Sequence, residues 1–218
     1  ETSYGLTART DSLTVFYACP PPFDNGYYSC YNIYGGGDAT VVNSGDITIS
    51  VGFEQDLAFG FGYGIVASTG MYGGNATVQN SGDISLIVTN GSGNGIAASS
   101  NGYRSNGNTY LTNSGDIFVS TTGFSTGIVA RSWNDVYVYN SGDITVSTSN
   151  IDERASGIYS LSTFESAYIN NSGDINALGG IGANGAGSAG NFGATTINSG
   201  DVSVTSSYFY TAYNYYGD

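Results

Sequence analysis

The chain has 218 residues, of which 34 are glycine, 19 are tyrosine and only 3 are proline. Four arginines stand against 17 acidic residues, lysine and histidine are absent, and the net charge is −13. This charge excludes the clustered cations by which proteins hold nucleic acid or anionic membranes, and no apolar run reaches the ~18 residues that a membrane-spanning helix needs.

The first distinctive segment is a cysteine-, proline- and tyrosine-rich insertion at about residues 12–37. It holds the only two cysteines, Cys19 and Cys30, on either side of the sequence PPPFDNGYYS. An even number of cysteines close together in a loop favours a disulfide and an oxidising compartment; the alternative is a pair of idle thiols. A start at Glu1 fits a processed, secreted protein, and a fragment would begin in the same way.

A tight acidic turn, NSGDI, then recurs along the chain and becomes NSGDV in its sixth copy. A second motif precedes each turn and reads glycine, branched aliphatic residue, any residue, small residue. The two motifs alternate through six units, which indicates an array of stacked units. The turn asparagines are Asn43, Asn80, Asn113, Asn140, Asn171 and Asn198, and the glycines of the second motif are Gly5, Gly64, Gly95, Gly127, Gly157 and Gly180.

Between the motifs, apolar and polar residues alternate at a period of two, as in VYVYNSGDITV at 136–146. This alternation predicts half-buried strands, three to a unit. One triplet of strands cannot bury its own apolar side, but parallel stacking of the triplets can. We therefore expect one all-β domain over residues 1–218, a single-stranded parallel β-solenoid of about six coils, right-handed as parallel crossovers nearly always are.

The turn residues and the small residues each have an expected role. Asparagine tolerates the left-handed backbone that a sharp corner requires, and glycine supplies it at no steric cost. Six equivalent asparagine amides, each with a donor and an acceptor, can also hydrogen-bond up the stack as an asparagine ladder. The small residue of the second motif leaves room where two walls approach. These small residues are Ala8, Ala67, Ala98, Ala130, Ser160 and Ala183.

The turn aspartates share one position in the repeat and should form a column, one strand spacing of ~4.8 Å apart. At that distance carboxylates repel, and three routes could offset the repulsion. The carboxylates could bond to turn amides or splay into solvent, bind a cation such as Ca²⁺, or be protonated in an acidic habitat. No other cofactor is predicted. The candidate metal ligands are Asp46, Asp83, Asp116, Asp143, Asp174 and Asp201.

The same column resembles the spaced carboxylate pair of a glycoside hydrolase. Six equivalent positions do not make one active site, however, and no histidine or lysine is present for general acid–base work. Arg9 and Arg131, which fall in the same position of units one and four, are expected to neutralise local charge rather than to clamp a substrate. We predict no enzymatic activity, and a polysaccharide-active enzyme is the third-ranked function.

The units G-I-x-A … x-V-x-N-S-G-D-I-x-V, from about Gly5 to Val204, resemble the repeats of autotransporter passenger domains and haemagglutinin-type adhesins. The resemblance implies a right-handed β-helix on a bacterial surface. It implies little about activity, because those repeats are a scaffold on which functions differ. The chain departs from a typical passenger in being very short.

Both ends of the repeat are aromatic, and the segment at about 206–218 carries Tyr208, Phe209, Tyr210, Tyr213, Tyr215 and Tyr216. Such ends either cap the open strand edges or mate with the next molecule. End-to-end stacking gives a filament when it does not close. We predict a secreted structural subunit that joins itself head to tail at the cell surface. The alternative is an adhesin or passenger-like protein whose tyrosine-rich insertion grips a glycan or another surface.

Overall fold

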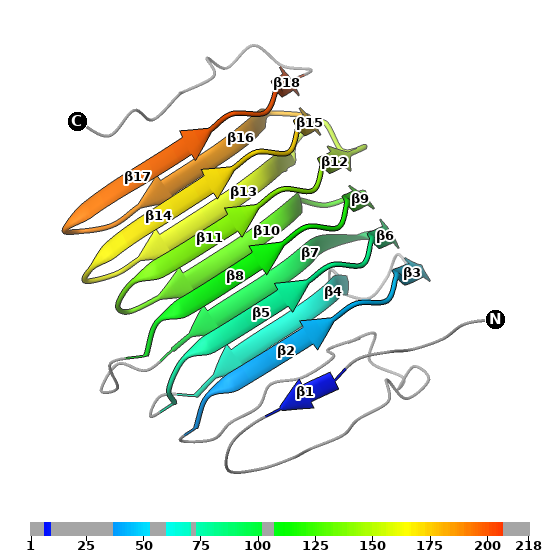
Figure 1. Cartoon of the computed structure of the whole chain (residues 1–218). Coiled ribbons are helices and arrows are strands. Elements are labelled where there is room, and N and C mark those ends of the chain that lie inside the picture. The colour runs from blue at the N-terminus through cyan, green and yellow to red at the C-terminus, as the bar shows by residue number, and fades with distance from the viewer. Residues whose placement is uncertain (1–6, 10–36, 53–59, 71–72, 102–106, 207–218) are drawn as a thin grey trace.

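The computed structural model describes residues 7–9, 37–52, 60–70, 73–101 and 107–206. These residues form eighteen strands and no helix, and hence no helix that could cross a membrane. The chain climbs as a solenoid in which each coil gives one strand to each of three sheets (Figure 1). The predicted all-β, parallel β-solenoid is confirmed.

We call the three sheets A, B and C. Sheet A contains β1 (Thr7–Arg9), β2 (Ala39–Asn43), β5 (Ala76–Asn80), β8 (Thr109–Asn113), β11 (Val136–Asn140), β14 (Ser166–Asn171) and β17 (Gly193–Asn198). Sheet B contains β3 (Ile47–Gly52), β6 (Ile84–Thr89), β9 (Ile117–Thr121), β12 (Ile144–Thr148), β15 (Ile175–Gly179) and β18 (Val202–Ser206). Sheet C contains β4 (Gly60–Thr69), β7 (Gly91–Ser100), β10 (Ser125–Ser132), β13 (Arg154–Ser162) and β16 (Gly182–Ala189).

In Figure 1 the strands of sheet A from β2 to β17 run from left to right in front, and those of sheet C return behind them as the chain climbs. This is right-handed coiling. Strands with the same place in successive coils pair in parallel and without a shift, so that Asn80 lies opposite Asn113 and Ile96 opposite Ile128. The register therefore stacks like residues of the repeat in columns.

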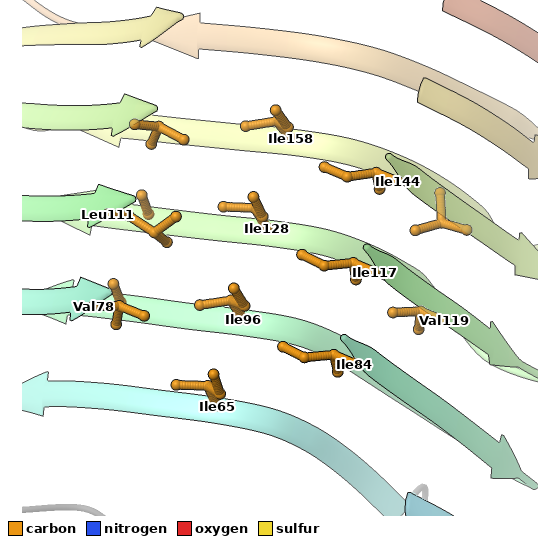
Figure 2. Packing of buried hydrophobic residues seen from close by; sticks show 14 of the residues in the cluster. Ile65, Val78, Ile84, Ile96, Leu111, Ile117, Val119, Ile128, Ile144 and Ile158 are labelled. Carbon is orange, nitrogen blue, oxygen red and sulfur yellow. The ribbon is translucent and has the colours of Figure 1, made fainter. Parts of the chain in front are cut away.

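The core consists of such columns (Figure 2). Isoleucines of the second motif stack in sheet C, and isoleucines that follow the NSGD turn stack in sheet B. At most 1% of each labelled side chain is exposed. The glycine before each sheet C isoleucine makes room for this packing: a Cβ on Gly95 would lie 2.5 Å from Ile117 Cγ2 and 2.7 Å from the Gly127 carbonyl oxygen.

The described residues form five complete coils, followed by β17 and β18, instead of six. The unit predicted from Gly5 is the exception. Its described part, β1, pairs antiparallel with β2 at the edge of sheet A and adds no strand to sheet C. A physical reason is the insertion at 12–37, which makes this unit too long to follow the path of the others. Arg9 accordingly lies opposite Thr40, whereas Arg131 lies between Ser99 and Leu161 in sheet C, so the predicted equivalence of the two arginines is wrong.

The last predicted copy of the second motif is also displaced. In β16, Ala186 pairs with Ile158 and Ser188 pairs with Ser160, so Gly185 stands in the position predicted for Gly180. Ala183 stacks on Ala155 instead of occupying the predicted position for a small residue. The sequence GGIGANGAGSAG fits the motif in two frames, and the structure adopts the frame that stacks Gly185 over Gly157.

Candidate functional site

The turn asparagines form a ladder of side-chain hydrogen bonds through the core. Asn43 Nδ2 donates to Asn80 Oδ1 at 2.7 Å, and the same bond recurs at 2.6–2.7 Å up to Asn198. Each Nδ2 also donates to the carbonyl of the glycine two residues later, as from Asn113 to Gly115 at 2.7 Å. The ladder has a direction, because every amide donor points to the acceptor of the next coil toward the C-terminal end.

The turn aspartates form a second, exposed ladder. The backbone N–H of Asp83 donates to Asp46 Oδ1 at 3.0 Å, and four further bonds of 2.8–2.9 Å continue the series to Asp201. Bonding to turn amides, the first of the three routes considered above, is therefore the one seen here. In the described residues no group of three or more acidic or cysteine side chains gathers as a metal site, and the calcium hypothesis stays a prediction.

A third ladder, at the corner before sheet A, was not predicted. Asp38 Oδ1 accepts the N–H of Asn75 at 2.6 Å, and Asn75 Oδ1 accepts the N–H of Asn108 at 2.8 Å. Asn108 and Asp135 continue the series at 3.2 and 3.1 Å. The signal in the sequence was an Asp or Asn directly before the strand in four successive units, obscured by the variable glycine-rich segments that precede it.

The glycine of the NSGD turn is needed for close stacking and not for a left-handed backbone. Among the described residues only Asn90 and Gly193 have a positive φ, so the predicted left-handed corner is wrong. A Cβ on Gly82 would instead lie 2.2 Å from the carbonyl oxygen of Gly45 in the coil below. Gly45 belongs to the first coil, and a Cβ there would meet nothing within 4 Å.

The two ends of the described solenoid differ. At the C-terminal end Val202 is 45% and Val204 is 37% exposed, although Ile175 and Ala177, their counterparts one coil below, are buried. β16, β17 and β18 are the edge strands of their sheets at this end. At the other end β1 occupies the edge of β2. The predicted disulfide (Cys19, Cys30) and the predicted aromatic contacts (Tyr208, Phe209, Tyr210, Tyr213, Tyr215, Tyr216) lie outside the described residues.

Tyrosines gather on the outer face of sheet A. Tyr110 and Tyr137 stack with ring centroids 5.4 Å apart, and Tyr139 contacts Tyr168 at 5.7 Å. Burial raises the pKa of the Tyr137 hydroxyl, and the negative charge of Asp135 raises it further. The exposed rings of Tyr110 and Tyr139 and the half-buried rings of Tyr137 and Tyr168 form an aromatic surface.

No protein family, no curated protein and no solved structure matches the chain.

Proposed function

We propose that this protein is an extracellular structural protein that assembles head to tail into a cell-surface filament or layer. The observation that carries the proposal is the direction of the two turn ladders. The asparagine ladder ends with the amide of Asn198 at one end and begins with the acceptor position of Asn43 at the other. A second copy stacked in register would let Asn198 Nδ2 donate to Asn43 Oδ1.

In the aspartate ladder the donors point toward the N-terminal end, opposite to those of the asparagine ladder, and this ladder also favours head-to-tail contact. In this ladder the N–H of each aspartate donates to the carboxylate one coil below. Asp201 Oδ1, in the last coil, is placed to accept an N–H from a further coil above it. The N–H of Asp46, in the first coil, is placed to donate to a further coil below it. Both ladders continue across a head-to-tail junction. A tail-to-tail junction would place amide donor against amide donor and carboxylate against carboxylate, which costs free energy in both rows.

Apolar burial and strand pairing favour the same contact. The next copy would cover the exposed parts of Val202 and Val204, which are 45% and 37% exposed, and so add part of the about 1.5–3 kcal/mol that full burial of such a side chain contributes. The edges of β16, β17 and β18 would gain backbone partners by strand addition. An extracellular location is supported by the cysteine pair, and a chain without lysine offers few sites to trypsin-like proteases.

A Gly45→Ala variant tests the proposal. A methyl group at this position meets nothing in the single chain, so its melting temperature should equal that of the wild type. In a head-to-tail junction Gly45 would stack on Gly200 of the neighbouring copy, and the new methyl group would clash there as a Cβ on Gly200 would clash 2.2 Å from the Gly173 carbonyl oxygen. We expect threads of the wild-type protein in electron microscopy and single particles of the variant.

Thr112→Ala is the control, because Thr112 is an exposed residue of β8 in the middle of the stack, away from both ends of the solenoid. It should assemble like the wild type. Monodisperse wild-type protein at high concentration, or threads of Gly45→Ala as long as those of the wild type, would contradict the proposed contact.

A second candidate function is adhesion, in the manner of an autotransporter passenger, and the tyrosine surface of sheet A favours it. Tyr110 and Tyr139 are 39% and 44% exposed, and aromatic rings at a surface anchor contacts with ligands. Here the double variant Tyr110→Ala, Tyr139→Ala should lose binding to immobilised neutral polysaccharide. Phe118→Ala, equally exposed on sheet B, should retain that binding. If the wild type binds no polysaccharide of a broad panel, glycan adhesion by this surface is excluded.

A further inference from the structure

The β2 edge that a head-to-tail junction needs is already occupied in the single chain. β1 pairs with it antiparallel, with Thr7 opposite Val42 and Arg9 opposite Thr40. We infer that this edge is the docking surface for β17 of a second copy, and that β1 is a removable cap that must leave before the second copy can bind. The inference rests on the proposed function and specifies how its contact is controlled.

β1 is a short occupant of this edge. It contributes three residue pairs, and its register stops short of both Ala39 and Asn43 at the two ends of β2. An antiparallel strand also reverses the direction of the chain relative to the rest of sheet A. β1 therefore does not extend the register that places like residues of successive coils opposite one another.

β17 is a longer occupant and matches the register. On its inner side it pairs with β14 through six residues in parallel, and this pairing includes the bond from Asn171 to Asn198. β14 and β2 hold equivalent places in sheet A, with Ala167 in the column of Ala39. The outer edge of β17 would thus meet all five residues of β2, and β18 of the same copy would meet β3.

A junction formed in this way exchanges a three-residue contact for strand pairing in at least two sheets. The exchange favours assembly once β1 has left, but β1 must first detach, which adds a barrier to the first encounter. The cap would keep single chains apart at low concentration and would still cover the N-terminal end of a growing thread.

A disulfide between β1 and β2 tests the inference. Thr7 and Val42 are directly opposite, and Cα atoms of antiparallel pairs lie about 4.5–5.5 Å apart, within the range that a disulfide spans. Val42 is exposed, so Thr7→Cys with Val42→Cys should leave the core intact. We expect the oxidised double variant to remain a single particle and the same variant to assemble into threads once reduced, measured by light scattering and electron microscopy.

The controls separate the role of β1 as a cap from head-to-tail assembly itself. Thr7→Cys alone has no partner thiol on β2 and should assemble with and without reductant, and peptide mapping of the double variant should find the new bond apart from the native Cys19 and Cys30. If the oxidised double variant assembles like the reduced one, β1 is no cap and the inference is wrong, although head-to-tail assembly stands. If the wild type itself forms no threads, the proposed function fails and the inference with it.

Discussion

Replacing Gly115 by alanine is expected to destabilise the solenoid by about 3–5 kcal/mol, near the upper limit for a single substitution. The new Cβ would lie 2.1 Å from the carbonyl oxygen of Gly82 and 2.5 Å from its carbon. Both atoms belong to the backbone of the coil below, so no side-chain rotation relieves the clash. Two coils must separate at this corner, and the adjacent bond from Asn80 to Asn113 must lengthen with them.

Thermal and denaturant unfolding measure the effect, and Gly45→Ala provides a close control. The two glycines stand in the same NSGD sequence, but a Cβ at Gly45 has open space around it. Equal stability losses in the two variants would show that the turn glycine acts through its conformational freedom, and the stacking argument would be wrong. Hydrogen exchange should place the loss at the corners of the coils that contain Gly82 and Gly115, because in a repeat array each coil contacts only its neighbours.

The asparagine and the glycine of the same turn differ in how far the sequence alone predicts their roles. The period of two and the constant order N-S-G-D place the asparagine on the same parity as the core residues, and that is enough to predict a buried column. The reason for the glycine is not local. It depends on how closely the Gly82 carbonyl approaches from the coil below, a distance that only the stacked register sets.

Register also explains the other errors of sequence interpretation. Near the C-terminus the motif reads GIGA from Gly180 and again, more weakly, as GAGS from Gly185, and local pattern favours the first. The choice of Gly185 follows from the parallel pairing of β16 with β13, a contact between residues about 28 positions apart. At the N-terminus the antiparallel pairing joins β1 to residues 31 to 35 positions further along the chain, which no periodicity predicts.

Asn113→Ala is expected to destabilise the protein by about 3–5 kcal/mol, because one substitution breaks three buried hydrogen bonds. The Asn113 amide accepts from Asn80 Nδ2 and donates to Asn140 Oδ1 and to the Gly115 carbonyl, each at 2.7 Å. The side chain is 1% exposed, so water cannot replace these partners without opening the core. An acceptor on Asn140 and one N–H of Asn80 would be left buried and unsatisfied, which costs more than the net value of the bonds.

Two variants separate the ladder from the packing around it. Asn113→Leu keeps the approximate size of the side chain but removes its donor and its acceptor, so a loss as large as that of Asn113→Ala assigns the effect to hydrogen bonding. Asn198→Ala removes one accepted and one donated bond at the exposed end and should cost about 1 kcal/mol. A stability loss at Asn198 equal to that at Asn113 would contradict the argument, because it would mean that burial within the stack adds nothing to the value of each rung.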